Sequence, residues 1–248
     1  MNSSISCRHS AASKSLAAVF FALLASPLVS GQALSVLPIN VFFTPGQRAT
    51  SVTVTNTGTT ETAIQIRAYA WSQKDGEDQL TATDLVVLSP PLAKIAPGAS
   101  QVIRLILRQL PEYGEATYRI LIDQIPPPSE AGVVHVVLRF SIPIFAQPPI
   151  RSFSDVQFHL ERDAGQIYLG AVNSGNLHDT IRDIELSTSD GHKLKPESGG
   201  SPYLLPGARR RWRIAAQDSL PSQSETLQLT AHLIAGAIDQ QVRFVPSR

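Results

Sequence analysis

From residue 35 onward, hydrophobic and polar residues alternate in short runs that are broken by proline, glycine, asparagine and aspartate. Alternation with a period of two is typical of half-buried strands, and no long segment has the period of a helix. About seven such runs before residue 150 predict an antiparallel sandwich of the immunoglobulin type rather than a parallel sheet. These runs are VLPINVFF, TSVTVTN, TAIQIRAYAW, TDLVVLS, SQVIRLIL, ATYRILIDQI and VVHVVLRFSIPIFAQPP.

The pattern restarts after AQPPIR, whose prolines Pro148 and Pro149 suit a short, stiff connection between two domains. The later runs are SDVQFHL, GQIYLGAVN, DTIRDIELST, RRWRIAA, SETLQLTAHL and IDQQVRFV. We therefore predict an all-β chain with two immunoglobulin-like β-sandwich domains, residues 34–149 and residues 150–248.

The two halves carry similar punctuation. The segment IAPGASQVIRLI (95–106) aligns without a gap with LLPGARRRWRIA (204–215), and VTNTG (54–58) resembles AVNSG (171–175). A Pro-Gly turn that leads into a strand is common in sandwiches, so the likeness favours two related domains without establishing them.

Residues 1–33 have the features of a secretory signal peptide. Arg8 and Lys14 precede the apolar run SLAAVFFALLASPLV, and small residues follow around SGQA, which predicts export and removal of this segment. The apolar run is too short for a convincing membrane anchor. The only cysteine, Cys7, lies in this segment, so the mature chain would have no disulfide, thiol redox chemistry or cysteine-ligated metal.

Removal of Arg8 and Lys14 would leave the mature chain close to neutral, which gives little support to nucleic-acid binding by overall charge. The one basic run is RRRWR (209–213). Because side chains alternate along a strand, we expect Trp212 to point inward while the neighbouring arginines are solvated.

Motifs that carry chemistry are scarce. The histidines are scattered, and the sequence has no HExxH, GxSxG, Walker A or GxGxxG motif, so we predict no enzyme, metal site or cofactor. A catalytic triad, which is recognised by geometry, stays an open alternative. DGED (75–78) is better explained as a polar hairpin tip than as a calcium loop.

Several motifs in the first half resemble, in order and spacing, those of the periplasmic chaperones of the chaperone–usher pathway. They are VFFTPGQRATSVTVTNTG, AYAW, LSPPLAKIAPGASQVIRL, EATYRILIDQIPP and IPIFAQPP. The resemblance covers most of residues 35–149, and the second half resembles the family more loosely, through LGAVNSGNLHD. It implies two sandwiches at an angle and a non-enzymatic periplasmic protein that binds pilin-like subunits and passes them to an outer-membrane usher.

The resemblance also implies that VVHVVLRFSIPIF is a donor strand, which fills the place of a strand that pilin subunits lack. Val134, Val136, Leu138 and Phe140 would share the face that enters the subunit, because side chains alternate along a strand. The alternative is an ordinary core strand buried in its own domain.

Two further expectations concern the same strand. We expect Val133, Val137 and the other residues of the opposite parity to be buried in their own domain. We also expect strand pairing to stop at Pro143, which cannot donate to a ladder.

Family members hold the subunit's terminal carboxylate with a basic pair, but the matching positions here are Asn40 and Pro143. Arg119 is our first replacement candidate, because arginine can hold a carboxylate through two parallel hydrogen bonds. Arg139 is the second and Arg104 the third. An outward-facing strand arginine is the alternative explanation of Arg119.

Glu115 resembles an acidic residue that locks the two domains of family members together, and Arg104 is our second candidate for the interdomain contact. The usual basic partner of the acidic residue falls on Gln147 here, so we expect this network to be altered.

Two alternatives remain at the level of function and assembly. An exported adhesion or carbohydrate-binding module would need an aromatic platform, for which 6% aromatic residues leave little material. An exposed apolar strand also invites pairing with another chain, so the free protein could cap itself as a dimer.

Overall fold

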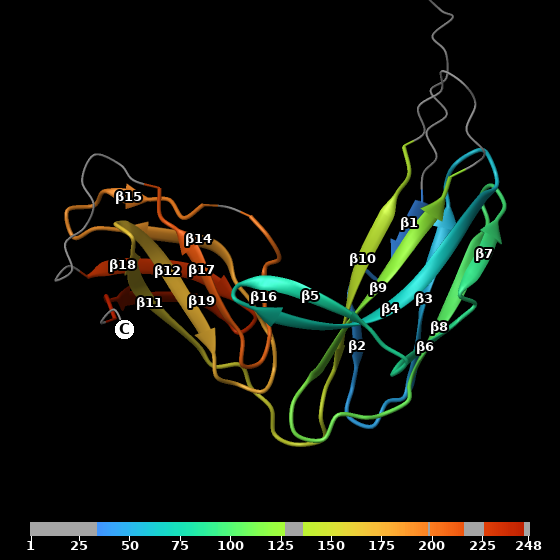
Figure 1. Ribbon diagram of the computed structural model, residues 1–248, viewed down its shortest axis with the longest axis horizontal. Coiled ribbons are helices and arrows are strands. Elements are labelled where there is room, and N and C mark those ends of the chain that lie inside the picture. The colour runs from blue at the N-terminus through green and yellow to red at the C-terminus, as the bar shows by residue number, and fades with distance from the viewer. Residues whose placement is uncertain (1–33, 127–135, 198, 216–225, 246–248) are drawn as a thin grey trace, which may run out of the picture.

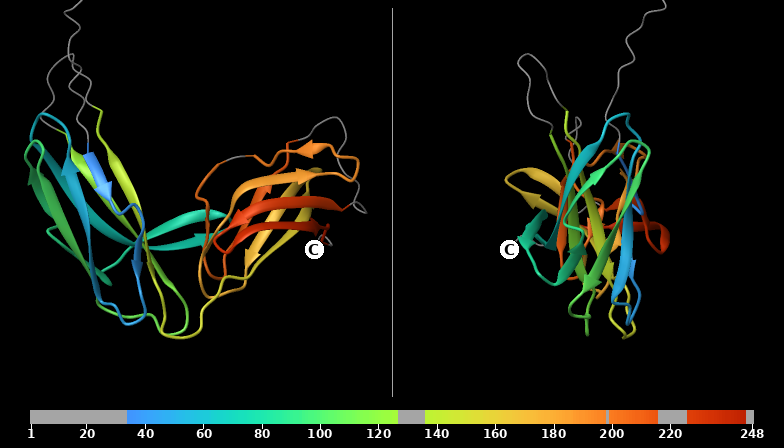
Figure 2. Two further views of the ribbon diagram at one scale, coloured as in Figure 1. Left: turned by 180° about the vertical axis from the view of Figure 1, so that it is seen from behind. Right: turned by 90° about the vertical axis from the view of Figure 1, so that its right-hand side faces the viewer.

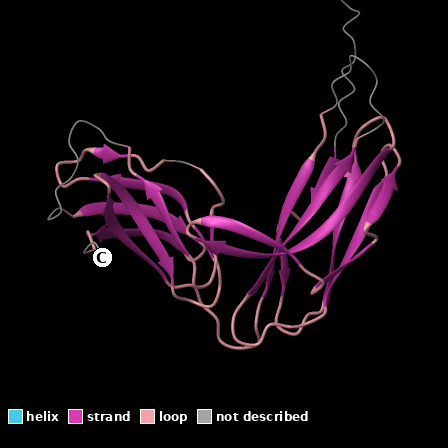
Figure 3. Ribbon diagram, viewed as in Figure 1, coloured by secondary structure: helices cyan, strands magenta, loops and turns pink. Residues whose placement is uncertain are grey.

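The computed structural model describes residues 34–126, 136–197, 199–215 and 226–245 (Figure 1). These residues form strands and connecting loops (Figure 3). The described part of the chain contains no helix, and hence none that could cross a membrane. The all-β prediction is confirmed.

The first domain is a sandwich of two sheets. One has the order β1-β3-β8-β6, and the other has the order β2-β10-β9-β4-β5 with β7 also paired to β4. The strands are β1 (Leu34–Leu37), β2 (Val41–Phe43), β3 (Ala49–Asn56), β4 (Thr62–Lys74), β5 (Glu77–Ala82), β6 (Val86–Ser89), β7 (Leu92–Ile95), β8 (Ser100–Leu107), β9 (Ala116–Ile125) and β10 (Arg139–Ala146). Aliphatic side chains from both inner faces are fully buried between the sheets, among them Ile64, Ile103, Leu105, Ile120 and Ile122.

The run VLPINVFF forms two strands in different sheets rather than the one strand expected. β1 pairs antiparallel with β3, whereas β2 pairs parallel with β10 in the opposite sheet. Pro38 lies between them, where a residue without an N–H group interrupts the ladder. Because β2 is short, it covers only Ile144–Ala146 of β10.

The second domain repeats the two-layer arrangement. One sheet has the order β11-β12-β17, another has the order β15-β14-β18-β19, and β13 pairs with β16. The strands are β11 (Val156–Asp163), β12 (Gln166–Asn173), β13 (Asp179–Thr180), β14 (Arg182–Ser187), β15 (Lys193–Leu194), β16 (Tyr203–Leu204), β17 (Arg209–Arg213), β18 (Leu227–Leu233) and β19 (Gly236–Val242). The two domains diverge from the linker that joins β10 to β11, so the molecule has a V shape (Figures 1 and 2). This arrangement confirms the expectation of two immunoglobulin-like domains at an angle.

The punctuation shared by the two halves corresponds to a shared asparagine corner. The N–H of Gly98 donates to the carbonyl of Asn56 at 2.8 Å, and the N–H of Gly207 donates to the carbonyl of Asn173 at 2.9 Å. Both asparagines are buried, and each side-chain amide donates to two backbone carbonyls. Both glycines have a positive φ, 72° and 71°, which favours glycine over any residue with a Cβ.

The strand β17 has the predicted alternation. Trp212 is buried, whereas Arg211 and Arg213 are exposed. Arg211 forms an ion pair of 3.0 Å with Asp163. The outward side chains of RRRWR are therefore solvated, whereas Arg210, which has the same parity as Trp212, is half-buried.

The expected hairpin tip at DGED is confirmed. Asp75 and Gly76 form the turn between β4 and β5, with φ angles of 52° and 85°. This hairpin extends from the first domain to the second (Figures 1 and 2). At its end, Gln73 Nε2 donates to the carbonyl of Tyr203 at 2.9 Å.

Candidate functional site: an open strand edge and the contact between the domains

One side of β10 pairs with β9, and much of the other side is open. The N–H of Gln124 in β9 donates to the carbonyl of Leu138 at 2.9 Å, so even-numbered residues bond to β9 in this antiparallel ladder. Odd-numbered residues point to the opposite side, as the bond of 3.0 Å from Gln147 N–H to the carbonyl of Phe43 shows. Among the described residues, no strand pairs with that side before Ile144.

Pro143 does not end the strand, and the expectation that pairing stops there is wrong. The ladder with β9 continues to Ala146. As an odd-numbered residue, Pro143 has its nitrogen on the side away from β9, so no bond to β9 is lost. Its missing donor falls on the open side, where proline is tolerated in an edge strand.

Even-numbered side chains along and before β10 pass from solvent into the core. Val136 is 78% exposed, Leu138 and Phe140 are half-buried, and Ile142 and Ile144 are 5% and 0% exposed. These side chains share one parity, so a single apolar row begins in the first-domain core and ends in solvent. The structure places three of the four predicted donor residues in this row, and Val134 lies outside the described residues.

The opposite parity differs from the expectation. Val137 is 47% exposed, and Arg139 and Ser141 are exposed as well. The prediction that this face is buried in the first domain is wrong for these residues, because it points away from the space between the two sheets. Val133 lies outside the described residues.

Arg119 lies where the two domains meet, in contact with Ser201 and Tyr203 of the second domain. It is the ladder partner of Pro143, so its side chain projects from the outer face of the β9–β10 pair. Only 12% of the side chain is exposed. The guanidinium donates to three oxygen atoms, those of Asp78 Oδ2, Ser141 Oγ and Ser201 Oγ, each at 3.3 Å.

The surroundings of Arg119 are partly apolar. Its Cζ lies 3.9 Å from the centre of the Trp71 ring, a cation–π contact. Burial lowers the pKa of Arg119, and the negative charge of Asp78 opposes that shift. Arg119 Nε and Trp71 Nε1 are both buried without a hydrogen-bond partner among the described residues. The contact between the domains therefore contains a nearly buried cation with unused donor capacity.

Aromatic rings form the contact between the domains beside Arg119. Phe145 stacks on His178, with ring centroids 3.5 Å apart and an interplanar angle of 9°. Trp71 meets Tyr203 edge-on at 5.5 Å, and Phe42 stacks on Phe145 at 5.6 Å. Rings from both domains thus make one apolar contact, and it includes Phe145 of the opposite parity.

Glu115, which we expected at the contact between the domains, bonds to His178 of the second domain. Its Oε2 accepts a bond of 2.9 Å from the backbone N–H of His178 and lies 2.7 Å from His178 Nδ1. The Glu115 side chain is fully buried. His178 takes the place of the basic partner that the sequence lacks at Gln147. It lies within the motif LGAVNSGNLHD, but that motif does not show that His178 faces Glu115.

Arg139 does not join Arg119. It is 63% exposed and forms an ion pair with Asp123, four ladder positions from Arg119, or about 13 Å along the strands. Burial raises the pKa of Asp123, but the hydrogen bonds and charges of Arg67 and Arg139 outweigh it, and the net pKa is lowered.

Arg104 is exposed on β8, in the sheet on the far side of the first domain (Figure 1). No described contact joins it to the second domain, so the interdomain role expected for Arg104 is not supported. Asn40, which occupies an expected basic position, does lie at the contact between the domains. Its Oδ1 accepts a bond of 2.8 Å from the Tyr203 hydroxyl.

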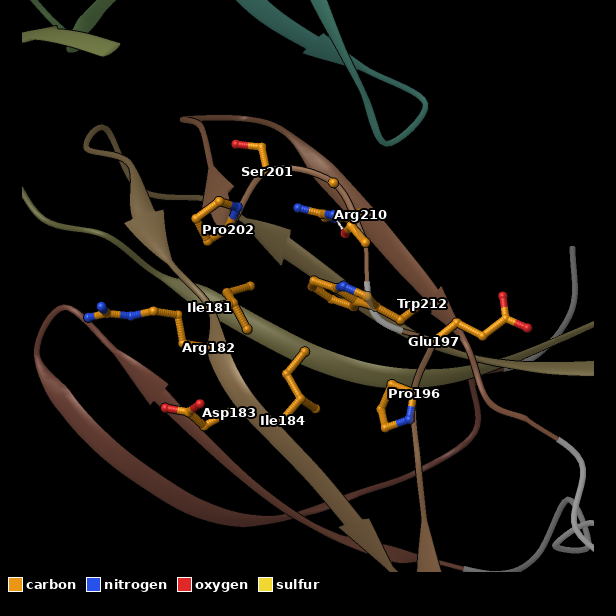
Figure 4. A pocket seen from close by; sticks show the side chains of 12 residues that line it. Ile181, Arg182, Asp183, Ile184, Pro196, Glu197, Ser201, Pro202, Arg210 and Trp212 are labelled. Carbon is orange, nitrogen blue, oxygen red and sulfur yellow. Dashed lines mark hydrogen bonds between the residues drawn. The ribbon is translucent and has the colours of Figure 1, made fainter. Parts of the chain in front are cut away.

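The second domain has a separate pocket of about 330 Å³ (Figure 4). Trp212, Ile181 and Ile184 supply its apolar part, and side chains of both charges, including Arg210 and Asp183, surround it. Its described lining contains no histidine or cysteine that could act with Ser201 in nucleophilic catalysis.

Comparisons with known proteins agree with this geometry. Residues 33–150 match the family model described as "Pili and flagellar-assembly chaperone, PapD N-terminal domain". The chain is 30% identical to the chaperone protein PapD of Escherichia coli over 86 residues, which are 33% of this chain and 36% of that protein. It is 27% identical to the chaperone protein FimB/FhaD of Bordetella pertussis over 210 residues, 77% of this chain and 81% of that one.

The fold is also similar to a solved structure, the CsuC chaperone in its pre-assembly complex with the CsuE tip adhesion subunit of Acinetobacter baumannii. The TM-score is 0.64 at 22% sequence identity, and the match covers 86% of this chain and 100% of that chain.

Proposed function

The chain belongs to the PapD family of pilus-assembly chaperones, and from this we propose that it binds incomplete pilin-like subunits through β10 and delivers them to an outer-membrane usher. The family is periplasmic and non-enzymatic. This assignment takes the place of the adhesion and carbohydrate-binding alternative. For this chain, we propose the binding of a subunit, the delivery to an usher and the residues that make these contacts.

The observation that carries the proposal is the apolar row of β10 beside an open strand edge. Val136, Leu138 and Phe140 would enter the groove of the subunit, and we expect Val134 to extend the row. A side chain of this size stabilises by about 1.5–3 kcal/mol when it moves from solvent to a buried site. The unpaired backbone groups before Ile144 would bond to the subunit's edge strand, as in other cases of strand addition.

Arg119 is our candidate for the carboxylate anchor. Its guanidinium is nearly buried, its contacts are long, and Nε has no described partner. A carboxylate could satisfy such a guanidinium through two parallel bonds. Arg139, which the sequence offered as a second anchor, is engaged by Asp123 and lies beside the donor row instead.

Co-expression of the mature chain with the pilin-like subunits encoded beside it tests the proposal. We expect a stable one-to-one complex after purification and mass analysis. Val136→Asp with Leu138→Asp should abolish capture and leave the free protein folded, because both side chains lie outside its packed core. Val102→Asp, an exposed substitution on β8, is the matched control and should leave capture unchanged. Normal capture by the folded double variant would exclude the donor strand.

Release and self-association follow from the same edge. We propose that the strand of the next subunit displaces β10, so that delivery to the usher requires no nucleotide. In the free protein, two open edges could pair and cap each other as a dimer. Sedimentation of the free chain, with and without the double substitution, tests this, and an unchanged monomer in both would exclude the dimer.

A further inference from the structure

Arg119 already holds a carboxylate in the free protein. Asp78 Oδ2 lies 3.3 Å from Arg119, and among the described residues Asp78 is the one acidic side chain in ion-pair contact with it. Asp78 comes from β5, in the hairpin that reaches the second domain, so it approaches Arg119 from outside the β9–β10 pair.

This contact is loose. All three bonds of the guanidinium measure 3.3 Å, whereas charge-assisted bonds between nitrogen and oxygen are usually about 2.7–2.9 Å. A single nitrogen of Arg119 faces Asp78, rather than the pair of nitrogens that a bidentate carboxylate takes. The Nε group has no described partner. Arg119 therefore has room for a better-placed carboxylate.

Asp78 has other partners that would remain after it lost Arg119. Gln73 Nε2 donates to its Oδ1 at 2.9 Å. Asp78 also interacts with the charge of Arg210 in the second domain. Burial lowers the pKa of Arg210, and the negative charges of Asp78 and Glu77 oppose that shift. An aspartate released from Arg119 would thus not be left as an uncompensated charge.

We propose that Asp78 is a placeholder carboxylate, which occupies Arg119 in the free protein and is displaced by the terminal carboxylate of the bound subunit. This inference rests on the proposed function, in which Arg119 is the anchor. Two carboxylates at one guanidinium repel each other, so Asp78 competes with the ligand. It also keeps the nearly buried Arg119 paired while no subunit is present, since an unpaired buried charge is strongly destabilising.

The test uses a peptide with the C-terminal strand sequence of the pilin encoded beside the chaperone, made as the free acid and as the carboxamide. Calorimetric titration compares the wild type with the variants Asp78→Asn, Glu77→Gln and Arg119→Gln. We expect Asp78→Asn to bind the free acid about fivefold more tightly and the carboxamide as the wild type does. Asparagine keeps an oxygen for Gln73, and Glu77→Gln, the control, removes an equal charge from the same hairpin without affecting either peptide.

The outcomes separate the two proposals. If neither the wild type nor Arg119→Gln binds the free acid more tightly than the carboxamide, Arg119 is not the carboxylate anchor. The proposed function then stands without that anchor. If the wild type prefers the acid and Arg119→Gln does not, yet Asp78→Asn binds the acid no more tightly, the placeholder inference is overturned.

A second measurement uses the intact complex and requires no peptide. The NMR signals of the Asp78 carboxyl carbon and of Arg119 Nε–H are compared between the free chain and the co-expressed complex. Displacement predicts that both signals shift on subunit binding. An Asp78 signal that stays at its free position would overturn the inference.

Discussion

The last strands of the two domains occupy matching places but differ in chemistry. In the first domain, β2 runs parallel to the end of β10, and in the second, Leu160 of β11 makes a parallel bridge to Phe244 just after β19. β19 is the edge strand of its sheet, and β10 is an edge strand before Ile144. The exposed positions of β19 include Asp239, Gln240 and Gln241, whereas β10 continues an apolar row into solvent.

The difference shows which features belong to the fold and which to the function. Both domains have the same asparagine corner. In both, a segment from the start of the domain lies parallel to its last segment, β2 beside β10 and β11 beside Phe244. Polar residues on β19 are a usual protection of an edge against unwanted pairing. The first domain lacks this protection along the apolar row, where we propose that a subunit binds.

The strongest test of the difference between the two strands is to give β10 charged residues, as β19 has. Val136→Asp with Leu138→Asp should lower subunit capture by about two orders of magnitude, because charged groups cannot enter an apolar groove unpaired. Gln240→Asp on β19 is the matched change in the second domain and should have no effect. Pull-down yields from co-expression measure both, and equal losses would show that the two edges do not differ in function.

The contact between the domains gives the next largest effect. His178→Ala should destabilise the protein by about 3 kcal/mol, since it leaves the buried Glu115 with only the backbone N–H of residue 178 and removes the ring that stacks on Phe145. Urea unfolding of this variant should separate into two transitions, one for each domain. A single transition at the midpoint of the wild type would show that this contact contributes nothing.

The shared corner allows the domains to be compared directly. Asn56→Ala and Asn173→Ala should each cost about 2–3 kcal/mol, because each removes two side-chain hydrogen bonds to backbone carbonyls, one of them buried. Calorimetry with one variant at a time should show the loss in the first domain for Asn56 and in the second for Asn173. If only one of the two variants lost stability, the matching hydrogen bonds would contribute unequally to the stability of their domains.

The smallest effect concerns acid pH. The pKa of Asp123 is lowered in the folded first domain, so its contribution to stability is present above about 3.9, the value in the unfolded chain, and is lost as the pH falls through the folded value. Asp123→Asn should flatten the fall of first-domain stability below that pH. Asp190→Asn is the counterpart in the second domain, where the Thr188 hydrogen bond lowers the aspartate pKa at an exposed site. We expect a weaker change there, and thermal melts from pH 5 to pH 2 compare the two.

Local patterns were enough to predict part of this structure. Alternation predicted the strands and the inward position of Trp212, and the Asp75–Gly76 turn followed from its residue types. The repeated Pro-Gly punctuation corresponds to bonds that match in both domains. These features depend on residues close in sequence or on parity alone.

Other features depend on where distant segments meet, which alternation does not encode. Parity groups Val137 with Phe145, yet one is exposed and the other is buried against the second domain, because the domain contact covers only one end of β10. Likewise, Asp78 and His178 contact Arg119 and Glu115 through tertiary packing. The motifs that contain these residues do not show which residues meet.

The position of Arg119 opposite Pro143 has a consequence for the register in which a subunit's strand would pair with β10. An anchor at a fixed ladder position sets where the end of the captured chain lies, and every residue before it then has a defined place along β10. A slip of one residue would turn each side chain of that strand to the opposite face. Arg119 would thus set the register in which the subunit's strand pairs with β10 and meets the apolar row.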